Sequence, residues 1–165
     1  MSKLFDLQNK NVLLTGASKG MGLAMAQGLV NHGANVVISS RKLDQCQKAV
    51  DTINESVKQE KAFAFSCNAS SKDELNALVD FSISKLGSIT TLVCNAGVNS
   101  FFGSMSEIDD ESYDKTMNTN VKSNHWLINM VSPSMKKSGG GSIMITSSIA
   151  AFDASETLGL SLIHI

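Results

Sequence analysis

Five short runs of apolar and β-branched residues alternate with segments of helical spacing along this chain, and this alternation limits its possible folds more than any other feature. The strand-like runs are residues 11–15, 34–39, 62–66, 89–94 and 142–146. Apolar residues recur at steps of three and four, as on one face of a helix, within residues 20–31, 43–57, 75–86 and 113–131. Strands and helices that alternate in this way form right-handed crossovers, so we expect a doubly wound α/β fold with a parallel sheet.

Turn and cap residues predict where the later elements begin and end. Ser70 or Ser71 is expected to cap the third helix, because a serine side chain accepts a hydrogen bond from the first turn. Gly87 is expected to end that helix. We expect residues 97–110 to form a loop and the long helix after it to continue until Pro133.

The charge balance excludes a basic nucleic-acid-binding surface. The 165 residues contain 14 Lys and Arg against 15 Asp and Glu, and Lys and Arg occur in runs of at most two. We therefore expect no nucleic-acid partner. The N-terminal segment lacks the apolar region of a signal peptide, and no apolar stretch approaches the roughly 18–20 residues of a membrane span. The sequence thus predicts a cytoplasmic protein without a membrane partner.

The three cysteines, Cys46, Cys67 and Cys94, are expected to be reduced and buried thiols. Their odd number and wide spacing fit neither a disulfide framework nor a zinc site. No histidine has a second metal-binding side chain at usable spacing. We therefore predict no metal site.

A glycine-rich turn, Thr15-Gly-Ala-Ser-Lys-Gly-Met-Gly22, joins the first predicted strand to the first predicted helix. Gly16 is expected to permit the tight turn, Gly20 to let the backbone approach a phosphate, and Gly22 to let the helix pack closely on the strand. The helix N-terminus offers N–H groups to a pyrophosphate. Glycines also end strands for structural reasons, but this placement favours a nucleotide site. Its expected contact residues are Gly16, Ser18, Lys19, Gly20, Met21 and Gly22.

The spacing Thr-Gly-x-x-x-Gly-x-Gly resembles that of the short-chain dehydrogenase/reductase family, and three further segments match this family in the same order. Asn95-Ala96-Gly97 follows the fourth predicted strand, although Cys94 stands where a second Asn is common. Asn120 lies in the long helix, and Ser148 follows the fifth strand. The resemblance implies a classical member with a Rossmann-type fold that is incomplete after the fifth strand.

The same resemblance implies roles for these matching residues. Ser148 and Asn120 would be catalytic. Ser148 would form a hydrogen bond with the substrate oxygen, and Asn120 would hold a water of the proton relay. The cofactor would contact Asn95, Ala96 and Gly97. Without the resemblance, a serine at a strand end often caps a neighbouring helix, and an asparagine in a helix often satisfies buried backbone.

The end of the second predicted strand indicates which cofactor is used. An acidic residue there would bind the ribose of NAD, whereas a basic residue would bind the 2′-phosphate of NADP. The sequence has Ser40 in the acidic position, Arg41 directly after it and Lys19 at the glycine turn, so we predict NADP in preference to NAD. The alternative is that these cations are solvated surface residues. Asn68 stands at the adenine edge, where the family usually has Asp.

The chain departs from the family at its C-terminal end. The resemblance implies a Tyr-x-x-x-Lys pair with the Tyr thirteen residues after Ser148, but that position is Ser161 and the only tyrosine is Tyr113. Residues 160–165 can be encoded by the mosaic end of a transposon adapter used for sequencing libraries. We therefore expect residues 1–159 to be the N-terminal portion of a single dinucleotide-binding domain, and residues 160–165 to be a non-native tail. The alternative is a genuine divergent tail.

The complete protein is expected to transfer a hydride between a nicotinamide cofactor and a small carbonyl or alcohol substrate, and to form a homo-oligomer. The 165-residue chain is expected to be inactive, because a serine hydroxyl cannot replace a tuned phenol as proton donor. It is also expected to fold poorly, since the fifth strand becomes a sheet edge. One alternative is a non-catalytic NADP-binding or sensing module. A methyltransferase would need a Gly-x-Gly-x-Gly turn and an acidic residue after the second strand, which are absent.

The sequence does not name the substrate. Three apolar side chains in the expected loop could form one wall of an apolar pocket or could pack on the core. They are Phe101, Phe102 and Met105.

Overall fold

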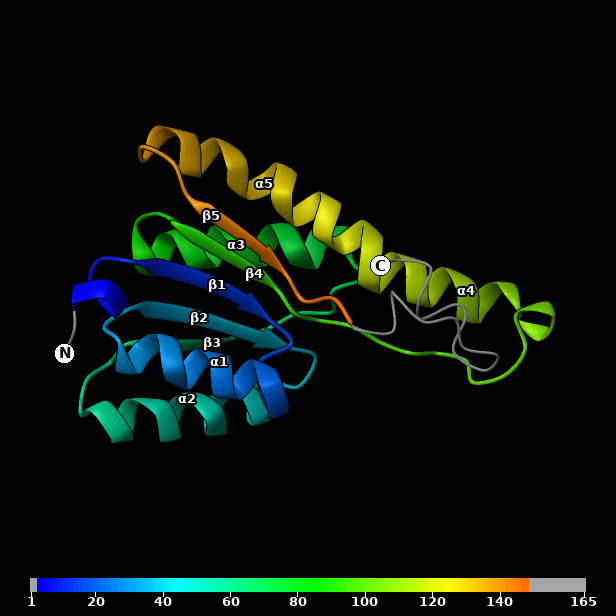
Figure 1. Ribbon diagram of the computed structural model, residues 1–165, viewed down its shortest axis with the longest axis horizontal. Coiled ribbons are helices and arrows are strands. Elements are labelled where there is room, and N and C mark those ends of the chain that lie inside the picture. The colour runs from blue at the N-terminus through cyan, green and yellow to red at the C-terminus, as the bar shows by residue number, and fades with distance from the viewer. Residues whose placement is uncertain (1–2, 149–165) are drawn as a thin grey trace.

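The computed structural model describes residues 3–148, which form one parallel sheet of five strands in the order β3-β2-β1-β4-β5. The strands, from one edge of the sheet to the other, are β3 (Ala62–Ser66), β2 (Asn35–Ser40), β1 (Asn11–Thr15), β4 (Thr91–Cys94) and β5 (Ser142–Ile145). Helices lie on both faces (Figure 1). This topology confirms the predicted doubly wound α/β fold.

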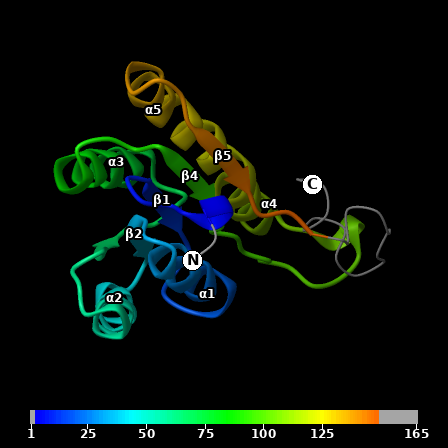
Figure 2. The ribbon, with the colours of Figure 1, turned by 60° about the vertical axis from the view of Figure 1, so that its left-hand side comes forward.

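Two layers of helices cover the sheet, as Figures 1 and 2 show. They are α1 (Gly20–Asn31) and α2 (Leu43–Val57) on one face, and α3 (Lys72–Leu86) and α5 (Ser123–Lys137) on the other. Val12 and Leu14 of β1 pack with α1 and α2, whereas Leu13 packs with α3 and α5. A strand buried on both faces needs apolar residues at every position, which explains the continuous apolar run in β1.

The register of the sheet brings the carboxyl ends of β1, β2 and β4 together. Thr15 of β1 lies beside Ser39 of β2, and Leu14 of β1 lies beside Val93 of β4. The chain leaves β1 toward β2 on one side and returns through β4 on the other. Between β1 and β4 the strand order therefore reverses, and this is where open α/β sheets bind their ligands, at the carboxyl ends of the strands.

The predicted cap and stop of α3 are confirmed. The Ser71 hydroxyl accepts a hydrogen bond from the N–H of Glu74 at 3.4 Å. Gly87 ends the helix at a φ of +77°, a conformation that favours glycine. The predicted loop of residues 97–110 is found over residues 97–109, apart from the short 3₁₀ turn η2 (Met105–Glu107), and residue 110 begins the next helix. A similar turn, η1 (Lys3–Phe5), precedes β1.

The prediction that the long helix ends at Pro133 is wrong. This segment consists of α4 (Asp110–Met117), the π-helical turn η3 (Asn118–Lys122) and α5, which continues beyond Pro133 to Lys137. A proline inside a helix removes one backbone hydrogen bond. Val131 and Met135, on either side of Pro133, are both buried in the core next to α3. Packing therefore keeps the helix intact across the proline.

β5 is an edge strand of the described sheet, as expected. Its side chains Ile143, Met144 and Ile145 are 39%, 51% and 51% exposed. The described chain therefore leaves apolar side chains of this strand open to solvent. Ser161 and the predicted tail of residues 160–165 lie outside the described residues. No helix within residues 3–148 is long and apolar enough to cross a lipid bilayer.

Candidate nucleotide-binding site

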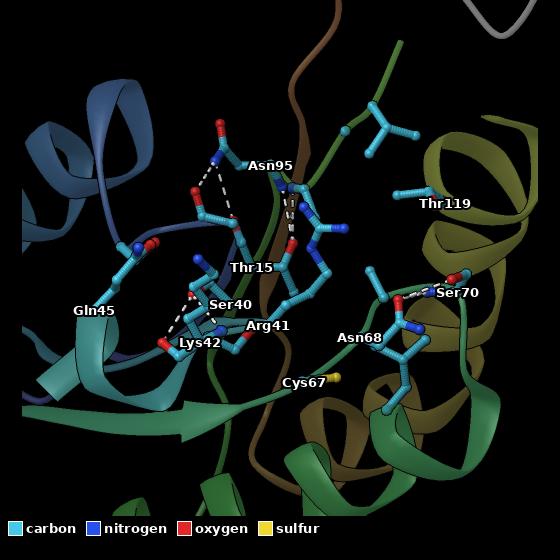
Figure 3. Close-up of a pocket in the computed structure, with 18 of the residues that line it drawn as sticks. Thr15, Ser40, Arg41, Lys42, Gln45, Cys67, Asn68, Ser70, Asn95 and Thr119 are labelled. Atoms are coloured by element: carbon cyan, nitrogen blue, oxygen red, sulfur yellow. Dashed lines mark hydrogen bonds between the residues drawn. The ribbon is translucent and has the colours of Figure 1, made fainter. Parts of the chain in front are cut away.

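An open cleft with a volume of about 570 Å³ lies at the carboxyl ends of β1, β2, β3 and β4 (Figure 3). A volume of this size suits a small-molecule ligand. The cleft is lined by most of the predicted cofactor residues, namely Gly16, Ser18, Lys19, Ser40, Arg41, Asn68, Asn95, Ala96 and Gly97. The remaining three, Gly20, Met21 and Gly22, form the first turn of α1 beside the cleft. The fold thus assembles the predicted nucleotide residues from four separate loops.

The glycine turn is packed too closely for side chains at two positions. A Cβ added at Gly16, which has a φ of +66°, would lie 2.8 Å from Cα of Ala96. A Cβ at Gly22 would lie 2.7 Å from Cα of Ala17. Gly20, by contrast, has a φ of +57° and open space where its Cβ would be. The turn therefore fits tightly against the sheet while its backbone at Gly20 stays open.

The N-terminus of α1 suits an anionic group. Lys19 is the N-cap residue, and its side chain makes no capping hydrogen bond within the described chain. The first N–H groups of a helix carry partial positive charge and hydrogen-bond well to phosphate. The open backbone at Gly20 and this uncapped helix end therefore fit a pyrophosphate.

Thr15 links the glycine turn to the loop after β4, a role that the sequence did not predict. Its side chain is 3% exposed, and its Oγ1 accepts hydrogen bonds from the N–H groups of Asn95 and Ala96, both at 3.1 Å. The Asn95 side-chain amide donates two hydrogen bonds, to the carbonyl of Thr15 at 3.1 Å and to that of Gly16 at 3.0 Å. The wall of the cleft between β1 and β4 is thus held by four side-chain to backbone hydrogen bonds. Only the position of Thr15 at a strand end hinted at this role.

The charged side chains that line the cleft are all basic within the described residues. Within the described part of the chain, its lining includes Lys19, Arg41, Lys42 and Lys115 but no aspartate or glutamate. The Arg41 side chain extends into the cleft from the end of β2 (Figure 3). Lys115, which comes from α4, was not predicted from the sequence. Four cations without a carboxylate favour an anionic ligand.

The β3 side of the cleft combines an amide with an apolar surface. The Asn68 Oδ1 accepts hydrogen bonds from the backbone N–H of Ser70 at 3.2 Å and from its hydroxyl at 2.8 Å. Cys67 and Leu75 line the cleft beside it and are buried. Burial raises the pKa of the Cys67 thiol from its ordinary value of 9.0 to about 12, so this thiol is neutral. A flat, uncharged base fits such a surface.

Asn120 lies next to the cleft and not in its lining. It is 7% exposed within η3, and its Oδ1 accepts a hydrogen bond from the N–H of Val98 at 2.8 Å. Its Nδ2 donates to the Val98 carbonyl, also at 2.8 Å. The Asn120 side chain therefore satisfies backbone groups of the loop after β4, the structural role noted above for helix asparagines. Its predicted water-binding role stays a prediction.

The other candidate residues lie outside the cleft lining. Ser148 is the last described residue and follows β5 at the same end of the sheet, where it is exposed. Phe102 and Met105 are 73% and 45% exposed and so do not belong to the described core.

Within residues 3–148, no group of three or more His, Cys, Asp or Glu side chains could hold a metal ion.

Comparison with known proteins agrees with this architecture. The sequence profile of the short chain dehydrogenases matches residues 10–159. Dehydrogenase/reductase SDR family member 4 from Homo sapiens is 39% identical over 158 residues, which cover 94% of this chain and 55% of that protein. This chain thus spans about half the length of the curated relatives that it matches.

Two solved structures show the same fold. A 7α-hydroxysteroid dehydrogenase complexed with NADH and 7-oxo glycochenodeoxycholic acid is 34% identical, with a TM-score of 0.88 over 96% of this chain and 61% of its own. L-Sorbose reductase from Gluconobacter frateurii, complexed with NADPH and L-sorbose, is 26% identical, with a TM-score of 0.91 over 97% of this chain and 60% of its own. With its parallel sheet, glycine turn and matching profile, this chain belongs to the short-chain dehydrogenase family.

Proposed function

We propose that this chain is the cofactor-binding part of an NADP-dependent oxidoreductase that acts on a carbonyl or alcohol substrate. The positive charge of the cleft is the observation that carries this proposal, because four cations and no carboxylate line it within the described chain. The two solved relatives named above contain NADH in one case and NADPH in the other. The choice therefore rests on this chain's own residues at the end of β2, where Ser40 and Arg41 replace an acidic residue.

The lining residues fit each part of NADP. The glycine turn and the N-terminus of α1 would hold the pyrophosphate. Ser40, Arg41 and Lys19 would hold the 2′-phosphate, where a guanidinium forms strong charge-assisted hydrogen bonds. Asn68 would lie at the edge of the adenine. When bound, NADP supplies hydride exchange at its nicotinamide ring.

The substrate end depends on residues beyond those that line the cleft. Ser148 would hydrogen-bond the substrate oxygen, and Asn120 would hold a water of the proton relay. The proton donor of the family is a tyrosine, and this sequence has Ser161 in its place. The 165-residue chain would thus bind NADP without turnover.

The alternative that the tail with Ser161 is native supports a second candidate, a non-catalytic NADP-binding or sensing module. NADPH oxidation over a panel of carbonyl compounds, measured on the full-length protein, separates the two candidates, since only the oxidoreductase is expected to carry the Tyr and Lys. Turnover supports the oxidoreductase, and cofactor binding without turnover supports the module.

We also propose a cellular compartment, a substrate class and an assembly for the whole protein. We assign it to the cytoplasm, with a small carbonyl or alcohol substrate and a homo-oligomeric assembly. The described thiols Cys46, Cys67 and Cys94 are buried and form no disulfide, as a reducing compartment favours. Size-exclusion chromatography of the full-length protein tests the assembly.

Cofactor affinity of the full-length protein tests the proposal directly. Titration calorimetry should show tighter binding of NADPH than of NADH, and Arg41→Asp should remove this preference. Each lost charge-assisted contact is worth about 1.5–3 kcal/mol, roughly ten- to a hundredfold in affinity. Lys48→Asp is the matched control, because Lys48 is an exposed cation of α2 outside the cleft lining. Equal affinity of the unmodified full-length protein for both cofactors would refute the proposal.

A further inference from the structure

Ser40, which lines the cleft at the end of β2, makes its shortest described polar contact with a buried thiol. Its Oγ lies 3.1 Å from Sγ of Cys46, in the first turn of α2. The same Oγ lies 3.4 Å from both the backbone nitrogen and the carbonyl oxygen of Lys42, so these are weaker contacts. Cys46 is fully buried, while Ser40 is half-buried beside the cleft. The thiol therefore supports the Ser40 hydroxyl from the side away from solvent.

We propose that Cys46 is a positioning residue for recognition of the 2′-phosphate, because its S–H group donates to Ser40 Oγ and leaves the Ser40 hydrogen directed at the phosphate. This inference rests on the proposed NADP function. It adds to that function a residue that does not touch the cofactor and acts through Ser40.

The direction of the hydrogen bond follows from the donors and acceptors that are present. A serine hydroxyl has one hydrogen and two lone pairs, so it can donate to only one partner at a time. A phosphate oxygen is a stronger acceptor than a thiol or a carbonyl, since a charged partner makes the bond shorter and stronger. With a phosphate in place, Ser40 donates to it, and Cys46 can then contribute only as the donor to Ser40.

The environment of Cys46 keeps it in the form that can donate. Burial raises the pKa of its thiol, and the nearby negative charge of Asp44 acts in the same direction, against the opposing effect of the hydrogen bonds with Ser40. The thiol is therefore protonated at neutral pH. An apolar residue of similar size would fill the same space but would leave Ser40 Oγ with only its two 3.4 Å contacts to Lys42.

Two adenosine ligands that differ only in the 2′-phosphate test this role. The probes are adenosine 2′,5′-bisphosphate and AMP, titrated calorimetrically into the full-length protein. They report on the adenine half of the cleft, whose lining lies within the described residues. Replacing Cys46 by alanine or valine should weaken the bisphosphate about two- to fivefold and leave AMP unchanged, as expected for loss of one weak neutral hydrogen bond. Cys46→Ser, which keeps a donor, should retain the ratio of the two affinities.

A double-mutant cycle separates positioning from packing. In the Ser40→Ala background, Cys46→Ala should have no further effect on the ratio, because its partner hydroxyl is gone. Ile53→Val is the control for packing, since Ile53 is buried on the same face of α2 and should leave the ratio unchanged. Circular dichroism reports whether each variant folds, and if the alanine variant does not, valine against serine at Cys46 gives the same comparison.

The outcomes distinguish the two levels of the proposal. If the unmodified chain binds both probes equally, the NADP function fails and this inference fails with it. If the protein prefers the bisphosphate but the Cys46 variants weaken the binding of both probes equally, the NADP function stands and the positioning role is refuted. The positioning role is also refuted if the Cys46 variants change the ratio of the two affinities as much in the Ser40→Ala background as with Ser40 present.

Discussion

Replacing Thr15 by valine tests whether one hydroxyl holds the cleft wall between β1 and β4. Valine has nearly the same shape as threonine, so the packing of this 3% exposed side chain is kept and only the hydrogen-bond acceptor is lost. The N–H groups of Asn95 and Ala96, each 3.1 Å from Thr15 Oγ1, are then left without this partner. Thr15→Val thus isolates the contribution of the two hydrogen bonds.

The size of the effect follows from the burial of those two donors. A buried N–H without a partner costs about 1–3 kcal/mol. Asn95 and Ala96 are only half-buried, so water recovers part of this cost and the lower end applies. We expect a loss of about 2 kcal/mol in the free energy of unfolding, which lowers Tm by roughly 4–8 °C for a domain of this length.

Urea and thermal unfolding followed by circular dichroism measure this loss. The control is Thr15→Ser, which keeps the hydroxyl and loses one methyl group, at a cost of about 0.8 kcal/mol. Stability should therefore decrease in the order Thr, Ser, Val. A valine variant that is as stable as the serine variant, or more stable, would show that packing and not hydrogen bonding fixes the wall.

Two further predictions concern stability. Gly22→Ala should destabilise the chain by about 1–3 kcal/mol and weaken NADPH binding, because its Cβ would meet the backbone of Ala17 at 2.7 Å. Gly28→Ala in the same helix, which has open space around it, should stabilise by about 0.5–1 kcal/mol; equal effects of the two changes in thermal unfolding would contradict this reasoning. Burial raises the pKa of the Cys94 thiol from 9.0 to about 12, so the unfolded chain loses this proton first, and the free energy of unfolding should fall as pH rises from 9 toward 12. Urea unfolding from pH 7 to 11 should show a smaller fall for Cys94→Ala, and an unchanged slope would contradict the assigned pKa.

The fold could be predicted because a strand that is buried on both faces of the sheet is a continuous apolar run in the sequence. The strand predicted at residues 11–15 has the bounds of β1. Its apolar side chains pack alternately into the cores on the two faces of the sheet. The prediction at Pro133 was wrong for the opposite reason. A local rule about proline does not include the packing of Val131 and Met135, which tertiary contacts supply.

Most of the predicted cofactor residues share one property that is visible in sequence, a position just after the carboxyl end of a strand. Parallel pairing brings such ends together, so the sequence is sufficient to assign Gly16 and Arg41 to one cleft. It is not sufficient for Thr15 and Cys46, because a threonine in a strand and a cysteine in an amphipathic helix look like core residues. Only the register of the sheet and the placement of α2 show which polar groups they meet.

The loop after β4 shows how hydrogen bonds within the protein hold one wall of the cleft. At one end, Asn95 bonds to the backbone of β1 and its turn, and at the other, Asn120 bonds to both backbone groups of Val98. Asn120 can reach Val98 from a π-helical turn, whose wider winding interrupts the regular hydrogen bonding of the helix. The Asn124 side chain donates a further hydrogen bond to the Asn120 carbonyl at 2.7 Å.

This arrangement explains why periodicity alone predicted one regular helix there. A five-residue π turn shifts the helical face by only a fraction of a turn, so the apolar spacing stays close to helical on both sides. The π turn matters for the polar side chains that it carries: Thr119 lines the cleft, while its neighbour Asn120 bonds to the loop after β4. The cleft wall is thus held from β1 and from η3 by hydrogen bonds within the protein, and a wall held in this way should add little ordering cost to binding.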